Sequence, residues 1–227
     1  MSKNKVENEE LIVDVQEVYS KTETFVENNK KAISGIIFAV IVVVGGYFGY
    51  KKLIIAPMEL KAQSDMFMAE KYFEQDSLQL AINGDGLNYG FLDIVDEYSG
   101  TKAANLAHYY LGICYRNIGE YEYAIDELKS FSSDDIMIST IALGAIGDSY
   151  MELGDIDAAI NYYGKAVSHG DNKLTSPIYL FKAGIACEDV QDFAAAEENY
   201  KAIKADYPDS REAQTIDKYI ARAEALK

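Results

Sequence analysis

The chain has 227 residues, a formal net charge of −16 and 49% hydrophobic residues, with only 3 Pro. This composition excludes a mainly disordered chain, because it supplies enough apolar surface to build a core. The negative charge lies almost entirely after residue 56 and would repel nucleic acid and anionic lipid head groups, so a basic or apolar protein is the better partner.

Residues 1–31 form a charged leader. Its apolar residues Leu11, Val15, Val18 and Phe25 recur at close to heptad spacing, which predicts a partly amphipathic helix. That helix either docks on a partner or extends the helix that follows it. A leader of this length, rich in Glu, differs from the short basic start of a cleaved secretory signal.

Residues 32–56 are predicted to form one transmembrane helix. No charged residue occurs among the 19 residues between Lys31 and Lys51, and a helix of that length roughly matches a ~30 Å hydrocarbon core. Tyr47 and Tyr50 lie just inside the C-terminal lysines, where aromatic rings favour the membrane interface. The alternative is a buried helix, which would normally show a polar face that this segment lacks.

A G-x-x-x-G pattern occurs inside this segment, at Gly45 and Gly49. Such a pattern lets two helices approach closely and would support a weak homodimer. It is also expected by chance in a span that contains several glycines.

Residues 57–103 are expected to form a degenerate first helix pair. A long helix is predicted from Met58 to Ile82, followed by the turn NGDG. The partner helix is expected to direct Leu87, Phe91 and Ile94 inward.

Residues 104–208 contain a sequence repeated three times. Gly112, Gly147 and Gly184 correspond, at spacings of 35 and 37 residues, and three alanines follow the same spacing. Stacked helix pairs need small residues where two helices cross and large residues beside them. The positions assigned to this packing are Gly112, Tyr115, Ala124, Gly147, Tyr150, Ala159, Gly184, Ala196, Tyr200 and Pro208.

The pattern resembles the tetratricopeptide repeat (TPR), whose period is 34 residues. The predicted fold is all-α: a single N-terminal transmembrane helix followed by a TPR helical-hairpin solenoid with a C-terminal capping helix. Residues 209–227 supply the capping helix, begun by an Asp/Ser cap. About nine helices after the span, and no sheet, are expected.

No catalytic, cofactor or metal site is predicted. The two histidines, His108 and His169, are far apart and are expected to have structural roles. Cys114 and Cys187 fall two repeats apart, too far for a disulfide, and are predicted to be buried free thiols.

The first helices of the repeats are expected to line a protein-binding groove. The candidate residues are Tyr109, Ile113, Arg116, Asn117, Gly144, Asp148, Met151, Glu152, Phe181, Ile185, Glu188 and Asp189. The apolar centre and acidic edge of this set suit an extended or helical segment that carries apolar and basic residues. In the alternative interpretation the acids are a solvated surface and the partner binds elsewhere.

The order of leader, uncleaved span and TPR domain resembles the bacterial ancillary Sec-translocon subunit family. The segment GFLDIVDEYSGTKAANLAHYYLGICY, residues 90–115, is similar to versions of that family in Bacteroidetes-type bacteria. The resemblance implies a single-pass inner-membrane protein with a cytoplasmic N-terminus and a periplasmic TPR domain. It also implies association with the Sec channel and with a periplasmic folding factor or secreted client.

Charge alone leaves the orientation open, because three lysines flank the span within about 20 residues on each side. The sequence therefore predicts a membrane-anchored TPR adaptor that mediates protein–protein interactions. A scaffold for envelope assembly or cell division is the alternative function. An enzyme on a helical scaffold is a third class, and it would require a convergent polar pocket.

Overall fold

The computed structural model describes the backbone of residues 3–227 and the side chains of residue 21 and residues 23–227. Within these residues the elements are helices, with no strands. The chain divides into two compact units, Met1–Ala56 and Pro57–Lys227, and each is described by itself.

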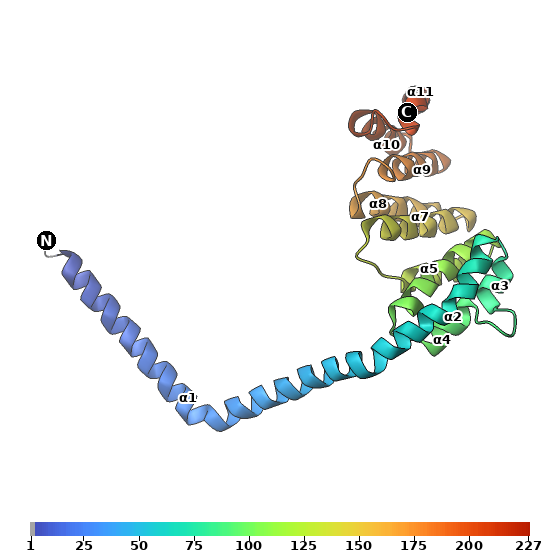
Figure 1. Cartoon of the computed structure of the whole chain (residues 1–227). Coiled ribbons are helices and arrows are strands. Elements are labelled where there is room, and N and C mark those ends of the chain that lie inside the picture. Colours follow the sequence, from blue (N-terminus) through green and yellow to red (C-terminus); the bar gives the residue numbers. More distant parts are fainter. Residues whose placement is uncertain (1–2) are drawn as a thin grey trace. The chain divides into compact units, whose positions relative to one another are not determined.

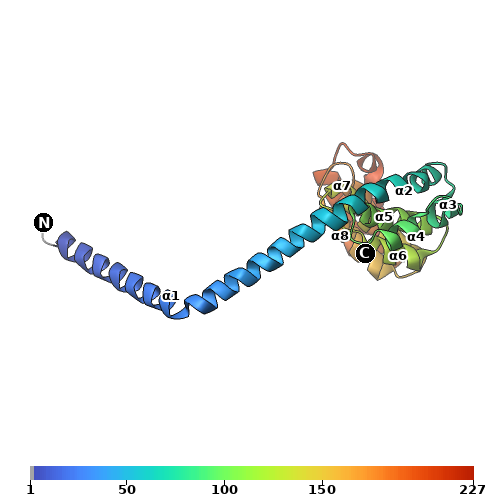
Figure 2. The same ribbon diagram turned by 60° about the horizontal axis from the view of Figure 1, so that its bottom comes forward.

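The described residues of the first unit form one long helix. It contains α1 (Lys3–Tyr50) and a π-helical turn (Lys51–Ile55), and Figures 1 and 2 both show a bend within α1. The helical stretch Glu23–Glu74 is long and apolar enough to cross a membrane, with a mean hydropathy of 2.2 in its most apolar window, none of which is buried. The side chains of Leu11, Val15 and Val18, on which the amphipathic leader helix was predicted, lie outside the described residues.

The second unit is a stack of helices that follow one another in chain order (Figure 1). They are α2 (Ala56–Glu74), α3 (Leu78–Asn83), α4 (Phe91–Glu97), α5 (Lys102–Asn117), α6 (Tyr121–Ser130), α7 (Ile136–Glu152), α8 (Ile156–His169), α9 (Ser176–Asp189), α10 (Phe193–Asp206) and α11 (Ile216–Leu226). The predicted fold class, an N-terminal apolar helix followed by TPR-type helical repeats and a C-terminal helix, is confirmed.

A glycine allows the two helices of each repeat to pack closely. The facing pairs are Gly112 with Leu128, Gly147 with Tyr163, and Gly184 with Tyr200. A Cβ atom built on any of these glycines would lie only 2.3–2.6 Å from the facing side chain. The large side chain therefore occupies the space that any other residue would fill.

The turns inside the repeats also follow from local sequence. Gly119, Gly154 and Gln191 end the first helices with φ of +87°, +78° and +61°, the left-handed region that suits a helix C-terminus. The side chains of Asp155 and Asp192 then accept hydrogen bonds from backbone N–H groups in the first turns of α8 and α10.

The start of the second unit differs from the prediction. The expected helix Met58–Ile82 is broken after Glu74, where Asp76 adopts a φ of +55°, so ten α-helices, α2 to α11, stand where the sequence predicts about nine. Phe91 and Ile94 are buried as predicted, whereas Leu87 is 93% exposed. The reason is that α4 begins only at Phe91, which leaves Leu87 in the preceding loop.

The C-terminal helix also begins later than expected. The Ser210 hydroxyl accepts a hydrogen bond from the N–H of Ala213, but this cap starts a 3-10 turn, and α11 begins at Ile216. At the other end of the stack, buried side chains of α2 pack into one cluster with those of α3, α4 and α5, and Figure 2 shows α2 lying over α5.

The two cysteines are buried in different clusters of the core, and the prediction of two free thiols is confirmed. Burial raises the pKa of Cys114 to about 12 and that of Cys187 to about 11. Neither thiol is therefore a reactive nucleophile at neutral pH.

Candidate protein-binding site

An open cavity of about 380 Å³ lies where successive repeats meet. We call it the inter-repeat cavity, and its lining residues are Arg116, Tyr121, Asp148, Met151, Glu152, Tyr163 and Lys182. Helices α5 to α9 all contribute to it. A surface built from several repeats suits a partner segment that lies along the stack.

Asp148 is the centre of the cavity. Lys182 Nζ donates to both carboxylate oxygens of Asp148, at 2.6 and 2.8 Å, and Arg116 Nη1 lies 3.3 Å from one of them. The hydroxyl of Tyr163 donates a further hydrogen bond of 2.9 Å. One carboxylate thus connects α5, α7, α8 and α9, and its charge is compensated by two cations.

The tyrosines around Asp148 stay neutral. Burial, and then the negative charge of Asp148, raises the pKa of Tyr163 far above its usual range. Burial likewise raises the pKa of Tyr179 to about 12. The ammonium group of Lys182 lies 5.9 Å from the ring centre of Tyr163 and 5.7 Å from that of Tyr179, close enough for cation–π attraction.

The structure brings together four of the predicted groove residues, namely Arg116, Asp148, Met151 and Glu152. It adds Tyr121, Tyr163 and Lys182, which the sequence analysis did not assign to the groove. A signal for Lys182 exists, because the 37-residue spacing between these repeats places it three residues, about one helical turn, before the equivalent of Asp148, and it carries the opposite charge.

Other predicted groove positions are used for packing between repeats. Ile113 is 8% exposed and lies in the cluster that joins α5 and α6 to α7. Tyr109 is half-buried, with its ring centre 5.3 Å from that of Phe131. The space beside Gly144 is filled by the ring of Tyr179. These positions are covered because the next helix pair packs directly on them.

Three of the four candidates in the third repeat contact α11 or lie in its packing cluster. The ring centre of Phe181 lies 4.8 Å from that of Tyr219, and Ile185 belongs to the same cluster. Glu188 accepts a hydrogen bond of 3.1 Å from Arg222 Nε. Asn117 and Asp189 are exposed at the C-terminal ends of α5 and α9.

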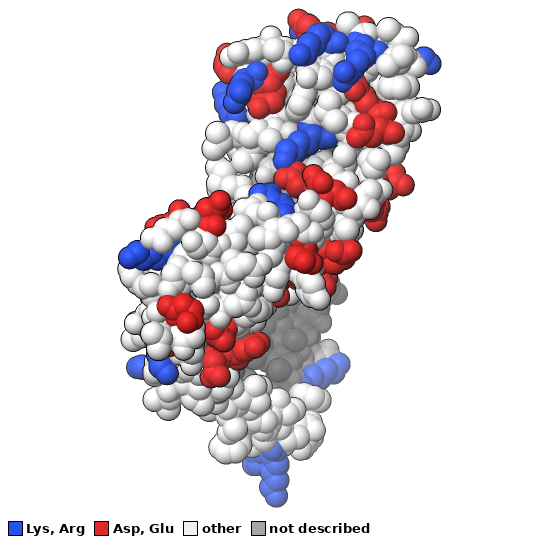
Figure 3. Space-filling view, turned by 90° about the vertical axis from the view of Figure 1, so that its right-hand side faces the viewer, with Lys and Arg blue, Asp and Glu red and all other residues white. Residues whose placement is uncertain are grey.

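Fewer acidic side chains are therefore available to a partner than the predicted acidic edge of the groove implies. Asp148 and Glu188 are ion-paired within the chain, whereas the structure gives Glu152 and Asp189 no ion-pair partner among the described residues. Figure 3 shows acidic and basic side chains interspersed on one face, with broad uncharged areas between them. The four charged residues that line the inter-repeat cavity, two cations and two acids, sum to zero formal charge, and Glu152 is the one without an ion-pair partner among the described residues.

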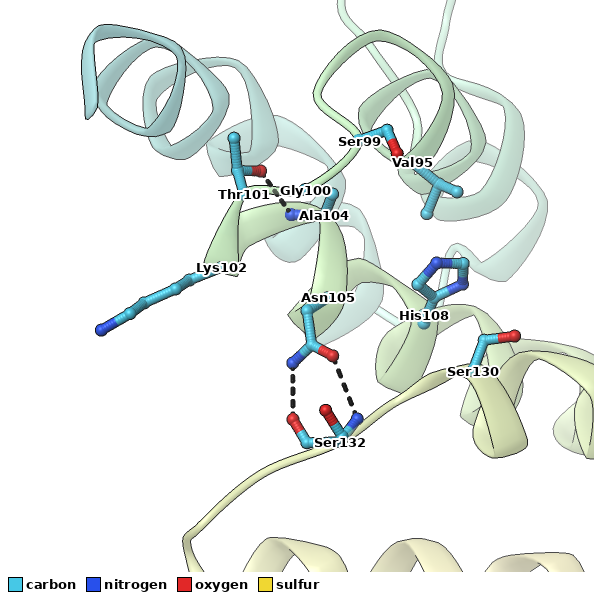
Figure 4. A pocket seen from close by; sticks show the side chains of 10 residues that line it. All are labelled: Val95, Ser99, Gly100, Thr101, Lys102, Ala104, Asn105, His108, Ser130 and Ser132. Atoms are coloured by element: carbon cyan, nitrogen blue, oxygen red, sulfur yellow. Dashed lines mark hydrogen bonds between the residues drawn. The ribbon is translucent and has the colours of Figure 1, made fainter. Parts of the chain in front are cut away.

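A larger cavity of about 480 Å³ lies between the end of α4, the start of α5 and the end of α6 (Figure 4). Several of its polar groups already have structural partners: the amide of Asn105 exchanges two hydrogen bonds, of 2.8 and 3.0 Å, with the backbone of Ser132. His108 Nδ1 lies 2.6 Å from a carboxylate oxygen of Glu127. No convergent reactive set is present here, and no group of three potential metal ligands occurs among the described residues.

Comparisons with known proteins identify the repeats. Sequence models of the tetratricopeptide repeat match residues 106–134 and 145–214. No curated protein matches the sequence significantly. The fold resembles two crystal structures of nearly identical TPR-like repeats from a Podosopora anserina putative kinesin light chain, the second of which carries a single substitution.

These two structures are 13% and 14% identical to this chain, each with a TM-score of 0.53, and each match covers 73% of this chain and 86% of the other. At such identities the likeness concerns the fold alone. The TPR fold is typically a non-enzymatic scaffold, and no enzyme family is among the matches. The chain thus contains tetratricopeptide repeats of the kind that mediate protein–protein interactions.

Proposed function

We propose that this protein is a single-pass adaptor of a bacterial inner membrane that holds its TPR domain beside the Sec translocon. In this proposal residues 1–31 are a cytoplasmic leader and residues 32–56 are the span. Residues 57–103 are a degenerate first helix pair, residues 104–208 three periplasmic TPR repeats and residues 209–227 a capping segment. The exposed apolar helix supports the anchor, and the resemblance to ancillary Sec subunits supports the location.

The inter-repeat cavity is the observation that carries the binding role. Met151 and the rings of Tyr121 and Tyr163 supply apolar walls, and Glu152 supplies an acidic group without an ion-pair partner in the described part of the chain. A partner segment would place an apolar residue against Met151 and a basic residue beside Glu152. Such a segment belongs to a periplasmic folding factor or a secreted client.

Anchoring of the TPR domain to the membrane explains how one small cavity is sufficient to bind a partner. A domain tethered to the membrane meets its partner at a local concentration that reaches the millimolar range for short linkers. A weak interaction at one cavity then gives substantial occupancy, and the partner is still released.

The test is photo-crosslinking in intact cells from the full-length chain with the reactive residue in place of Tyr121 of the cavity lining, which leaves Glu152 intact. Asn161, exposed on α8 and outside the cavity lining, is the matched control position. Capture of translocon subunits, periplasmic folding factors or emerging secreted chains from position 121 alone would support the proposal. Capture of division or envelope-assembly proteins would support the alternative scaffold, and capture of cytoplasmic proteins alone would reverse the orientation.

A charge variant tests the cavity itself. Glu152→Lys should reduce capture of a basic segment, because it replaces attraction by repulsion. Asp189→Lys makes the same change of charge at an exposed acid outside the cavity lining and should leave capture unchanged. Equal loss with both variants would show that net charge, rather than the cavity, controls binding.

A further inference from the structure

The loop between α3 and α4 presents an apolar side chain directly to solvent. Leu87 is 93% exposed, the highest value among the exposed large hydrophobic residues of the described chain. Figure 1 shows this loop projecting at the edge of the second unit. Single exposed apolar residues are common in proteins, so the exposure matters only together with the features around it.

The first of these features is an ordered backbone. The carboxylate of Asp85 accepts hydrogen bonds from the N–H of Leu87 (2.9 Å) and the N–H of Asn88 (2.7 Å). The Tyr72 hydroxyl (2.7 Å) and the side-chain amide of Asn88 (2.9 Å) donate to its other oxygen. These donors, with the Tyr72 hydroxyl first, hold the pKa of Asp85 well below its usual range.

The second feature is the close approach of the two ends of the loop. A Cβ atom on Gly90 would lie 2.3 Å from the backbone nitrogen of Gly84, and Gly84 itself adopts a φ of +73°. Only glycine allows the two ends of the loop to touch in this way. Residues 84–90, which we call the Leu87 loop, therefore form a compact loop with Leu87 near its tip, the type of loop that frequently carries function.

The third feature is the surface beside the loop. A cavity of about 290 Å³ is lined by Ser64, Asp65 and Met68 of α2 and by Leu87, Asn88 and Tyr89 of the loop. Asp65 is the one charged residue in this lining, and its carboxylate accepts a hydrogen bond from the Tyr98 hydroxyl. The surface thus combines a projecting leucine, an adjoining hollow with a methionine and a tyrosine, and negative charge.

We propose that the Leu87 loop is a second docking surface, which inserts Leu87 into an apolar socket of a folded protein partner whose rim carries Lys or Arg. A fixed loop loses little conformational entropy on binding, so burial of the leucine contributes almost fully to affinity. The basic rim complements Asp65. A second copy of this chain is disfavoured as the partner, because two acidic domains would repel each other.

This surface is separate from the inter-repeat cavity, since it is built from α2 and the Leu87 loop whereas the cavity is built from α5 to α9. A protein with two docking surfaces can hold two partners at once. The two proposals are therefore tested at different residues, and the failure of one leaves the other intact.

The experiment places a photo-crosslinking residue at position 87 of the full-length chain in its native membrane, with position 174 as the control. Leu174 is a leucine that is 65% exposed in the loop between α8 and α9. One identified protein captured from position 87 but not from position 174 is expected. Its affinity for the purified full-length chain in detergent is then measured.

In that assay Leu87→Ser should weaken binding by about 10- to 100-fold, the value of burying one leucine side chain. Leu174→Ser should leave the affinity unchanged. Asp85→Ala keeps Leu87 but removes the acceptor that orders the loop, so it too should weaken binding. Added salt should weaken binding of the wild-type chain, because the proposed rim is charged.

Several results would overturn the proposal. These are capture of a second copy of the chain or of lipid from position 87, equal capture from positions 87 and 174, and unchanged affinity of the Leu87→Ser variant. A lower thermal unfolding midpoint of Leu87→Ser than of the wild-type chain would assign a structural role to the leucine and would overturn it as well.

Discussion

Asp148 shows how strongly the surroundings of a residue decide its role. From the sequence it is one of several acids expected on the groove. In the folded chain Lys182, Arg116 and Tyr163 all direct polar atoms at its carboxylate, so it links adjacent repeats instead of presenting free charge. The carboxylate available to a partner is then that of Glu152, which has no ion-pair partner within the described residues.

Replacement of Asp148 by Ala should lower the free energy of unfolding by about 2 kcal/mol. The change leaves the Tyr163 hydroxyl without its acceptor and two half-buried cations without their counter-ion. Urea unfolding of the full-length chain in detergent, followed by helicity, measures the effect. Asp189→Ala is the control and should stay within about 0.5 kcal/mol, because Asp189 is exposed and unpaired among the described residues. Equal losses would contradict the linking role.

Glu197 predicts an acid-sensitive contact between α10 and the C-terminal residues. Hydrogen bonds from Lys201 and Lys227 lower the pKa of Glu197 from 4.5 to about 2. Because the folded pKa lies below the unfolded one, the stabilisation is fully present above pH 4.5 and is lost as the pH falls toward 2. The thermal unfolding midpoint of wild type should therefore exceed that of Glu197→Gln at about pH 6, and the gap should close on acidification. A gap that is constant with pH would contradict this prediction.

At the scale of the element, the repeat period identifies which residues face one another. The three glycines of the repeat all lie against a large residue of the second helix, at the spacing that the sequence predicts. The period does not identify which faces stay open. Phe181 and Ile185 occupy groove positions in the repeat, yet α11 covers them because it packs on the last repeat as a further helix would.

Replacement of Gly184 by Ala should destabilise the third repeat by about 1–3 kcal/mol. The added Cβ would lie 2.3 Å from the fully buried ring of Tyr200, which has no room to move. Gly164→Ala is a matched control, since Gly164 lies inside α8 and a methyl group added there would have no heavy atom of another element within 4 Å. That control should be neutral or stabilising by up to about 1 kcal/mol through helix propensity. Similar losses for both variants would contradict the close crossing of α9 and α10.

At the scale of the whole molecule, the long apolar helix and the repeat domain differ in where their apolar side chains lie, and so in the solvent that favours them. Val42, Val43 and their neighbours are exposed along α1, which water would penalise and a bilayer would favour. The second unit buries its apolar residues in its own clusters. The two parts together fit a tethered adaptor, which is why the proposed function requires both.

A double substitution of Val42 and Val43 by Lys should release the chain from membranes. Each lysine near the centre of a span costs about 2.5–3.5 kcal/mol on insertion. Carbonate extraction of membranes from expressing cells measures the released fraction, which should rise from near zero to most of the protein. A matched pair of lysines at Leu174 and Val190, exposed in the second unit, should not change extraction. Retention of the span variant would contradict a bilayer-spanning role.

The Leu87 loop marks the limit of what helical periodicity predicts. Phe91 and Ile94 belong to α4 and are buried as their spacing indicates, but Leu87 precedes the helix start. The predicted partner helix does not begin at Leu87, because two non-helical contacts, from Tyr72 to Asp85 and from Gly84 to Gly90, fix these residues as a loop instead. Such contacts leave no periodic signal in the chain.

The helical class, the repeat, the glycine crossings, the free thiols and the long apolar helix could all be predicted from the sequence, because period, residue size and hydrophobicity act locally. Only the folded chain shows which groove positions remain open, which groups compensate the charge of Asp148, and how far Leu87 projects into solvent. These depend on which neighbour covers a given face, and a cation 34 residues away or a helix packed on the end of the stack is fixed only when the whole chain folds.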